Sequence, residues 1–85
     1  MIEIMLFGSA KRKLGTDKNL FLIDKKGPVS VREALRLAGF KEELLNSERI
    51  LAQCGMNTMR LSKALDRMDL NDGDRLTLIN VVQGG

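Results

Sequence analysis

Alternating hydrophobic and polar positions at the two ends of the chain predict β-strands. Residues 2–8 place Ile2, Ile4 and Leu6 on one face, and the opposite face is also fairly apolar. A strand with two apolar faces is typical of a central strand, so we expect this segment to lie inside the sheet with both faces covered. Residues 75–81 form a second strongly apolar strand.

Two further strands are predicted between these ends. Residues 19–24 hold a run of four apolar residues, and residues 49–54 are apolar at four of six positions. The polar stretch around Gly15 favours an antiparallel hairpin of the first two strands. The Asn-Asp-Gly-Asp sequence at residues 71–74 is a strong turn signal, because the glycine accepts a positive φ and the Asp side chains bond nearby backbone.

One main helix is predicted after the Gly-Pro pair in the middle of the first half. Ser30 is a good N-cap residue, and Glu33 three residues later completes a capping box. Apolar residues recur at helical spacing up to Ala38, and Gly39 can end the helix in a left-handed conformation. Residues 41–46 are compatible with a short helical turn or with a loop.

The segment 55–70 is mixed in character, and its methionines, Met56, Met59 and Met68, are irregularly spaced. A methionine-lined binding surface is one interpretation of this segment. Methionine more commonly fills gaps at the edge of a small core, and we prefer that interpretation.

The predicted order of strand, strand, helix, strand and strand indicates an α+β fold. A mixed sheet of four to five strands would carry one main helix packed across it. A length of 85 residues leaves room for one modest core. We therefore expect residues 1–85 to form a single domain, with residues 82–85 as a flexible C-terminal tail.

Composition narrows the function classes. No apolar run approaches the length of a membrane span, and none has the pattern of a signal peptide. We therefore expect a cytoplasmic protein. The chain has no histidine and one cysteine, Cys54, so we expect no metal site, no disulfide and no enzyme that acts alone. Cys54 ends an apolar strand, which favours a small buried core residue over a persulfide acceptor or a thioester link.

Positive charge is concentrated in the first half of the chain. Residues 1–45 hold nine Lys and Arg against six Asp and Glu, whereas residues 46–85 hold five of each. Residues 11–13 and 25–26 each follow a strand, so together they can form a basic end that suits an acidic partner or phosphate; a solvated loop face is the commoner role. We expect no nucleic-acid binding, because the apolar neighbours of the only aromatic residues indicate core positions for Phe7, Phe21 and Phe40.

The order of elements resembles the ubiquitin-like β-grasp fold. Residues 1–15 (MIEIMLFGSAKRKLG) are similar to the opening of the MoaD/ThiS family of sulfur carriers. Residues 70–85 (LNDGDRLTLINVVQGG) resemble that family's Asp-Gly-Asp turn, apolar strand and terminal Gly-Gly. The resemblance covers the whole chain in outline and is nearest to MoaD, the small subunit of molybdopterin synthase.

The resemblance implies that the C-terminal carboxylate of Gly85 is the reacting group. A ubiquitin-activating-like adenylating enzyme would use ATP to adenylate it, and a sulfur donor such as a cysteine desulfurase or rhodanese would convert it to a thiocarboxylate. Val81, Val82, Gln83 and Gly84 would contact the partner. Three extended residues span only about 10 Å, and glycine lacks the Cβ that would block a narrow channel. The chain itself would bind no cofactor.

Molybdopterin synthesis is the destination that the resemblance favours. The thiocarboxylate would then insert into the large subunit of molybdopterin synthase, which transfers the sulfur, while this chain supplies no acid or base. Three alternatives remain open. They are a ThiS-like carrier that serves a thiazole synthase, a ubiquitin-like modifier conjugated to proteins through Gly85, and a non-catalytic β-grasp interaction module.

Overall fold

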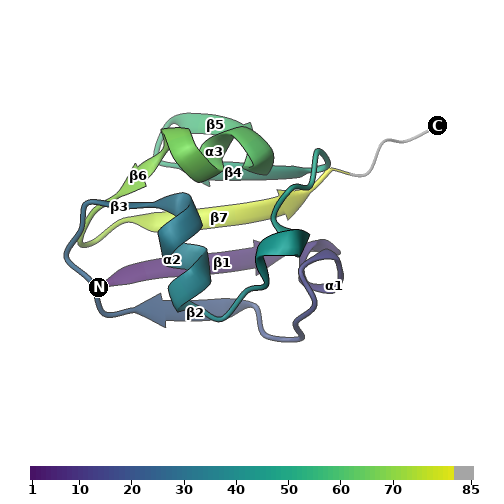
Figure 1. The fold of residues 1–85 in the computed structure, drawn as a ribbon, viewed down its shortest axis with the longest axis horizontal. Coiled ribbons are helices and arrows are strands. Elements are labelled where there is room, and N and C mark those ends of the chain that lie inside the picture. The colour runs from purple at the N-terminus through teal and green to yellow at the C-terminus, as the bar shows by residue number, and fades with distance from the viewer. Residues whose placement is uncertain (82–85) are drawn as a thin grey trace.

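Short helices separate single strands or pairs of consecutive strands along the chain (Figure 1). The computed structural model describes residues 1–81. The strands of this part of the chain are β1 (Ile2–Phe7), β2 (Leu20–Ile23), β3 (Val29–Ser30), β4 (Ile50–Cys54), β5 (Asn57–Arg60), β6 (Asp69–Leu70) and β7 (Arg75–Asn80). The helices are α1 (Ala10–Lys13), α2 (Val31–Leu37) and α3 (Leu61–Arg67), with a 3-10 turn, η1 (Glu42–Leu44).

The strand β7 is the centre of a five-stranded sheet with the order β2-β1-β7-β4-β5. It runs parallel to β1, with Phe7 opposite Ile79, and antiparallel to β4, with Leu51 opposite Ile79. The outer pairs, β1 with β2 and β4 with β5, are antiparallel, and β3 and β6 form a separate two-stranded sheet. This mixed sheet with helices packed across it confirms the predicted α+β class and is compatible with a β-grasp.

The helices α2 and α3 lie across one face of the sheet (Figure 1). The Ser30 hydroxyl oxygen accepts a hydrogen bond from the backbone N–H of Glu33 at 3.1 Å, which confirms the predicted N-cap. The carboxylate of Glu33 does not close the predicted capping box, because it pairs with Arg36 at 2.6 Å. The helix ends before Gly39, whose φ of +96° confirms the predicted left-handed stop.

The core lies between this sheet face and the helices. Alternate strand residues point into it, as do helix residues at a spacing of three and four. The strands contribute Ile2, Ile4, Leu6, Ile50, Ala52, Leu76 and Leu78, and the helices contribute Val31, Ala34, Leu35, Leu61, Ala64 and Leu65.

The opposite face of the sheet carries no helix among residues 1–81. The prediction that residues 2–8 are covered on both faces is therefore wrong, although β1 is central as predicted. Phe7 is 47% exposed, so it is not a core residue. Phe40 is buried and Phe21 is half-buried, and their rings pack with centroids 4.8 Å apart.

Three segments hold elements that the sequence pattern did not predict. The connection between the first two strands contains α1, the residues before α2 form β3, and residues 55–70 contain β5, α3 and β6. Met68 is buried and Met59 packs against the core, whereas Met56 is fully exposed and fills no gap. The short helical turn expected within residues 41–46 is present as η1.

The two basic segments of the first half do not meet. Because β1 and β2 are antiparallel, Ile23 lies opposite Ile2, and residues 25–26 follow β2 near the start of β1. Residues 11–13 lie beyond the other end of β1, in α1. The alternative of a common basic end is therefore wrong, and the preferred interpretation, a solvated face, agrees with the exposure of residues 12–13 and 25–26.

Candidate functional site at the end of the last strand

The described chain leaves the sheet at Val81, beside β4. The backbone N–H of Val81 donates to the carbonyl of Arg49 at 2.7 Å, which extends the pairing one residue beyond β7. Of the predicted site residues, Val81 is half-buried at this edge. The other four, Val82, Gln83, Gly84 and Gly85, lie outside the described residues.

A side-chain contact holds the end of β7 against the start of α1. The Asn80 Nδ2 atom donates to the Ser9 hydroxyl oxygen at 2.5 Å. The Asn80 Oδ1 atom is buried and has no hydrogen-bond partner within the described chain. Because a buried amide that loses its remaining partner is costly, this contact fixes the position from which the tail departs.

An apolar row crosses the uncovered face of the sheet close to Val81. Phe7, Ile79 and Leu51 lie side by side on β1, β7 and β4, because both registers place Ile79 opposite the other two. Phe7 is 47% and Ile79 is 36% exposed, and Leu51 is half-buried. Grouped exposed apolar side chains of this kind mark interaction surfaces on soluble proteins. We refer to Phe7, Ile79 and Leu51 as the outer row.

The polarity of this face changes with distance from the tail. The next row holds Met5, Thr77 and Gln53, and beyond it Arg75 pairs with Glu3 at 3.0 Å. The apolar end of the face is thus the end where the described chain leaves the sheet.

A hollow of about 390 Å³ lies beside Val81. It is lined by Glu48, Arg49, Leu51, Arg60 and Val81, and Arg60 pairs with Glu48 at 3.3 Å across it. These side chains supply charge and an apolar wall.

Sequence reasoning missed the outer row because it assigned Phe7 to the core. The signal was present in residues 2–7, where both alternating faces are apolar. Two arrangements give this pattern. In one, both faces of the strand are buried. In the other, helices bury one face and the second face is an exposed apolar surface.

Cys54 lies at the other end of β4. Ile50 is opposite Asn80, so Cys54 is four residues further from the tail, roughly 14 Å along the strand. The prediction for Cys54 is a small buried core residue; the side chain is half-buried and packs against the core. Its partial burial, and secondarily the nearby Asp74 carboxylate, raise the pKa of the Cys54 thiol. A protonated thiol is a poor nucleophile, which disfavours a role in sulfur relay.

Within residues 1–81, no group of three His, Cys, Asp or Glu side chains gathers to hold a metal ion. No helix in that range has the length and apolarity needed to cross a membrane.

The sequence matches no protein-family model and no curated protein. The geometry at the end of β7 and the residues that follow it are therefore the basis for inferring a function.

Proposed function

We propose that this chain is a cytoplasmic sulfur carrier of the MoaD/ThiS type that acts through the carboxylate of Gly85. The observation that carries the proposal is a juxtaposition. The sequence Val-Gln-Gly-Gly follows Val81 directly, at the end of the central strand, and the exposed outer row lies on the same end of the sheet.

The outer row supports the proposal because an activating enzyme must hold the carrier while the tail reaches its nucleotide. An apolar patch beside the tail can dock on such an enzyme and aim the tail. The hydrogen bonds of Val81 with Arg49 and of Asn80 with Ser9 give the tail a fixed base. The carrier needs no catalytic residues of its own, since the partner supplies them.

The chemistry proceeds in two steps on the partner enzyme. A carboxylate oxygen of Gly85 attacks the α-phosphorus of ATP and releases pyrophosphate, which gives an acyl adenylate. The outer sulfur of a persulfide on a cysteine desulfurase or rhodanese then attacks the acyl carbon and displaces AMP, which gives an acyl disulfide. A second thiol attacks the donor cysteine's sulfur, forms a disulfide with it and releases the thiocarboxylate. The favoured acceptor is the large subunit of molybdopterin synthase, and a thiazole synthase is the alternative.

The test is intact-mass measurement after incubation with an adenylating enzyme of the ubiquitin-activating type, ATP and sulfide. Replacement of one oxygen by sulfur adds about 16 Da, and the added mass should lie on the C-terminal peptide. Omission of ATP and deletion of Gly85 should each abolish it, whereas Met56→Ala, at a fully exposed site on a remote loop, should not.

The two alternatives that are not sulfur carriers each give a different result. A conjugating modifier would appear attached to lysines of other proteins through an isopeptide bond. An interaction module would show no mass change and would bind its partner equally well without Gly84 and Gly85. Either result in place of the thiocarboxylate contradicts the proposal.

A further inference from the structure

The two edges of the five-stranded sheet differ sharply in polarity. The β5 edge carries Asn57, Thr58 and Arg60, which are all exposed. The β2 edge, residues 20–23, is apolar at every position, and Leu20 and Leu22 are 41% and 55% exposed. Proteins usually protect an edge strand with charges or proline because it can pair with another chain. β2 has neither within the strand, and among residues 1–81 its outer side, away from β1, carries no further strand (Figure 1).

The backbone of β2 is oriented for such pairing. The N–H of Leu6 donates to the carbonyl of Asn19 at 2.9 Å, and the register continues with Ile4 opposite Phe21. Hydrogen-bonded positions recur at every second residue of an antiparallel pair. Because Asn19 is such a position, the backbone N–H and C=O of Phe21, two residues further, also face β1. The N–H and C=O groups of Leu20 and Leu22 therefore point away from the sheet.

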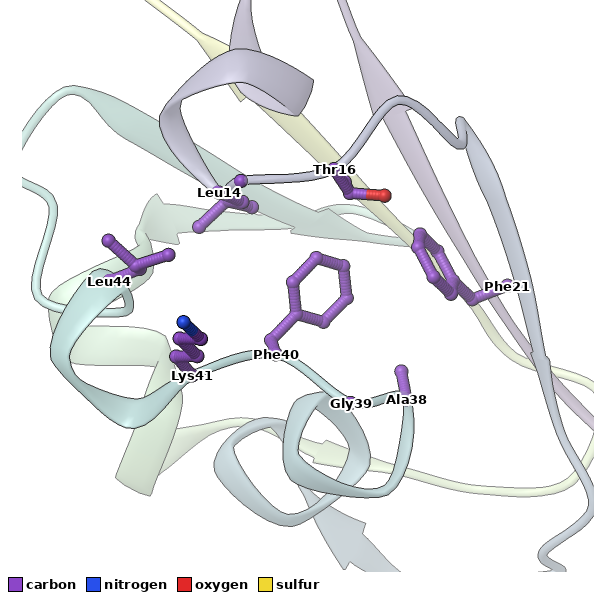
Figure 2. A pocket seen from close by; sticks show the side chains of 9 residues that line it. Leu14, Thr16, Phe21, Ala38, Gly39, Phe40, Lys41 and Leu44 are labelled. Atoms are coloured by element: carbon purple, nitrogen blue, oxygen red, sulfur yellow. The ribbon is translucent and has the colours of Figure 1, made fainter.

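Two hollows lie along the helix side of β2. The first, of about 240 Å³, contains Phe40 at its centre, with Phe21 on one side and Leu44 and Lys41 on the other (Figure 2). The second, of about 230 Å³, is lined by residues that include Leu22, Ile23, Lys25 and the exposed Leu37 of α2.

The spacing of the hollows fits an added strand. Phe21 lines the first hollow and Ile23 the second, two residues further along β2. Side chains two apart in a strand point the same way and are about 7 Å apart. Alternate residues of an extended segment that pairs with β2 would therefore reach successive hollows.

The charges around this edge are mostly positive. Residues 17–26 hold three lysines and two aspartates, and Lys41 stands across the first hollow. The ammonium of Lys18 lies 4.9 Å from the centre of the Phe21 ring. Within residues 1–81, no lysine forms an ion pair. These lysines are therefore available to acidic groups of a partner, whereas a second copy of this chain would bring more lysines.

We propose that the β2 edge binds an extended segment of a partner protein, with apolar residues at alternate positions and acidic residues at its flanks. The segment adds a strand to the sheet, bonds to Leu20 and Leu22, and places apolar side chains in the two hollows. Its acidic flanks meet Lys18 and Lys25. This recruitment site lies on the opposite side of β7 from the hollow beside Val81 and does not depend on Gly85 chemistry.

The probe is a synthetic peptide with blocked ends, in which Val-Ile-Val-Ile is flanked on both sides by Asp-Glu pairs. Titration into isotopically labelled protein should shift the amide resonances of residues 20–23 and of Leu37. Two further peptides carry N-methyl groups at odd or at even positions of the apolar core. Because only one set of peptide amides can face β2, one of these should lose at least about tenfold in affinity while the other binds well.

Matched charge reversals test the lysines. The double variant Lys18→Glu with Lys25→Glu should weaken binding by about tenfold or more. The double variant Lys63→Glu with Arg67→Glu makes the same charge change on exposed positions of α3 and should leave the affinity within about twofold. Deletion of Gly85 should leave peptide binding unchanged while it abolishes thiocarboxylate formation, so the two proposals fail independently.

Any one of four results would overturn the proposed site. They are no binding of the parent peptide at millimolar concentration, equal binding of both N-methylated peptides, equal effects of the two charge reversals, and resonance shifts confined to the outer row. Concentration-dependent shifts of residues 20–23 without peptide would assign the edge to a second copy of the chain and also overturn it.

Discussion

The side-chain amide of Asn80 donates to the hydroxyl oxygen of Ser9 at 2.5 Å and joins residues that are 71 positions apart. This contact links the last residue of β7 to the residue that precedes α1. The Oδ1 atom of the same amide is buried without a partner within residues 1–81. The bond to Ser9 is therefore the one side-chain hydrogen bond of Asn80 in that range.

Ser9→Ala should destabilise the fold by about 1–3 kcal/mol, because it leaves the Asn80 amide without its acceptor. In an Asn80→Ala background the same substitution should be almost neutral. Urea unfolding of the four proteins measures this coupling. Equal destabilisation by Ser9→Ala in both backgrounds would show that the hydrogen bond is energetically irrelevant.

Phe7→Ser should impair adenylation of the tail without unfolding the protein. The side chain is 47% exposed, so its loss should change the free energy of unfolding by less than about 1 kcal/mol. The apparent KM for the carrier in ATP–pyrophosphate exchange should rise about tenfold, because docking is weakened while the reacting groups are unchanged. Met56→Ser, at a fully exposed methionine, is the matched control. An unchanged KM would exclude the outer row from docking.

Among the glycines of residues 1–81, alanine should lower the stability of the fold most at Gly27. A Cβ at Gly27 would lie 2.4 Å from the carbonyl oxygen of Leu70 and 2.9 Å from the Cα of Asn71, so backbone must move. At Gly55, where φ is also positive but the space is open, alanine should cost only about 1 kcal/mol. Thermal unfolding should show a markedly larger loss for Gly27→Ala, and equal losses would contradict the close approach.

Acid should weaken the contacts of α2. Hydrogen bonds from Arg32 lower the pKa of Asp66, and those from Arg36 lower the pKa of Glu33. Folded carboxylates with lowered pKa bind fewer protons than unfolded ones, so their contribution is full above about pH 5 and is lost as the pH falls through the folded pKa. The stability difference between the wild type and Asp66→Asn should therefore shrink toward zero at low pH. A difference that persists at low pH would show that the stabilisation by Asp66 does not come from its charge. The control is Asp17→Asn, at an exposed loop position.

Cys54 should react slowly with iodoacetamide at neutral pH. Partial burial and the Asp74 charge raise the thiol pKa, so less thiolate is present in the folded protein than in the protein unfolded in urea. Asp74→Asn should increase the rate, and Cys54→Ser should retain thiocarboxylate formation. Complete loss of that activity in a folded Cys54→Ser variant would give the thiol a role in sulfur transfer.

Much of the fold was accessible from local pattern. The strands β1, β2, β4 and β7 follow from apolar runs bounded by turn residues, and α2 follows from its N-cap and apolar period. The helix α3 was missed although Leu61, Ala64, Leu65 and Met68 have helical spacing. The helix α3 is as long as α2, but its N-cap residue is Arg60, which makes no side-chain capping hydrogen bond, so no capping signal marks its start.

The sequence by itself determined the segments that form β1, β2, β4, β7 and α2, because the repeat of apolar residues and the capping side chains act over a few positions. It also supplied the Gly-Gly tail and the resemblance on which the proposed chemistry rests. Only the tertiary structure decided which face of β1 is covered, and hence that Phe7 joins Ile79 and Leu51 on an exposed row. It likewise brought Asn80 to Ser9 and left β2 as an apolar edge. Strand order and helix placement arise from contacts between residues far apart in the chain, and a local pattern does not contain them.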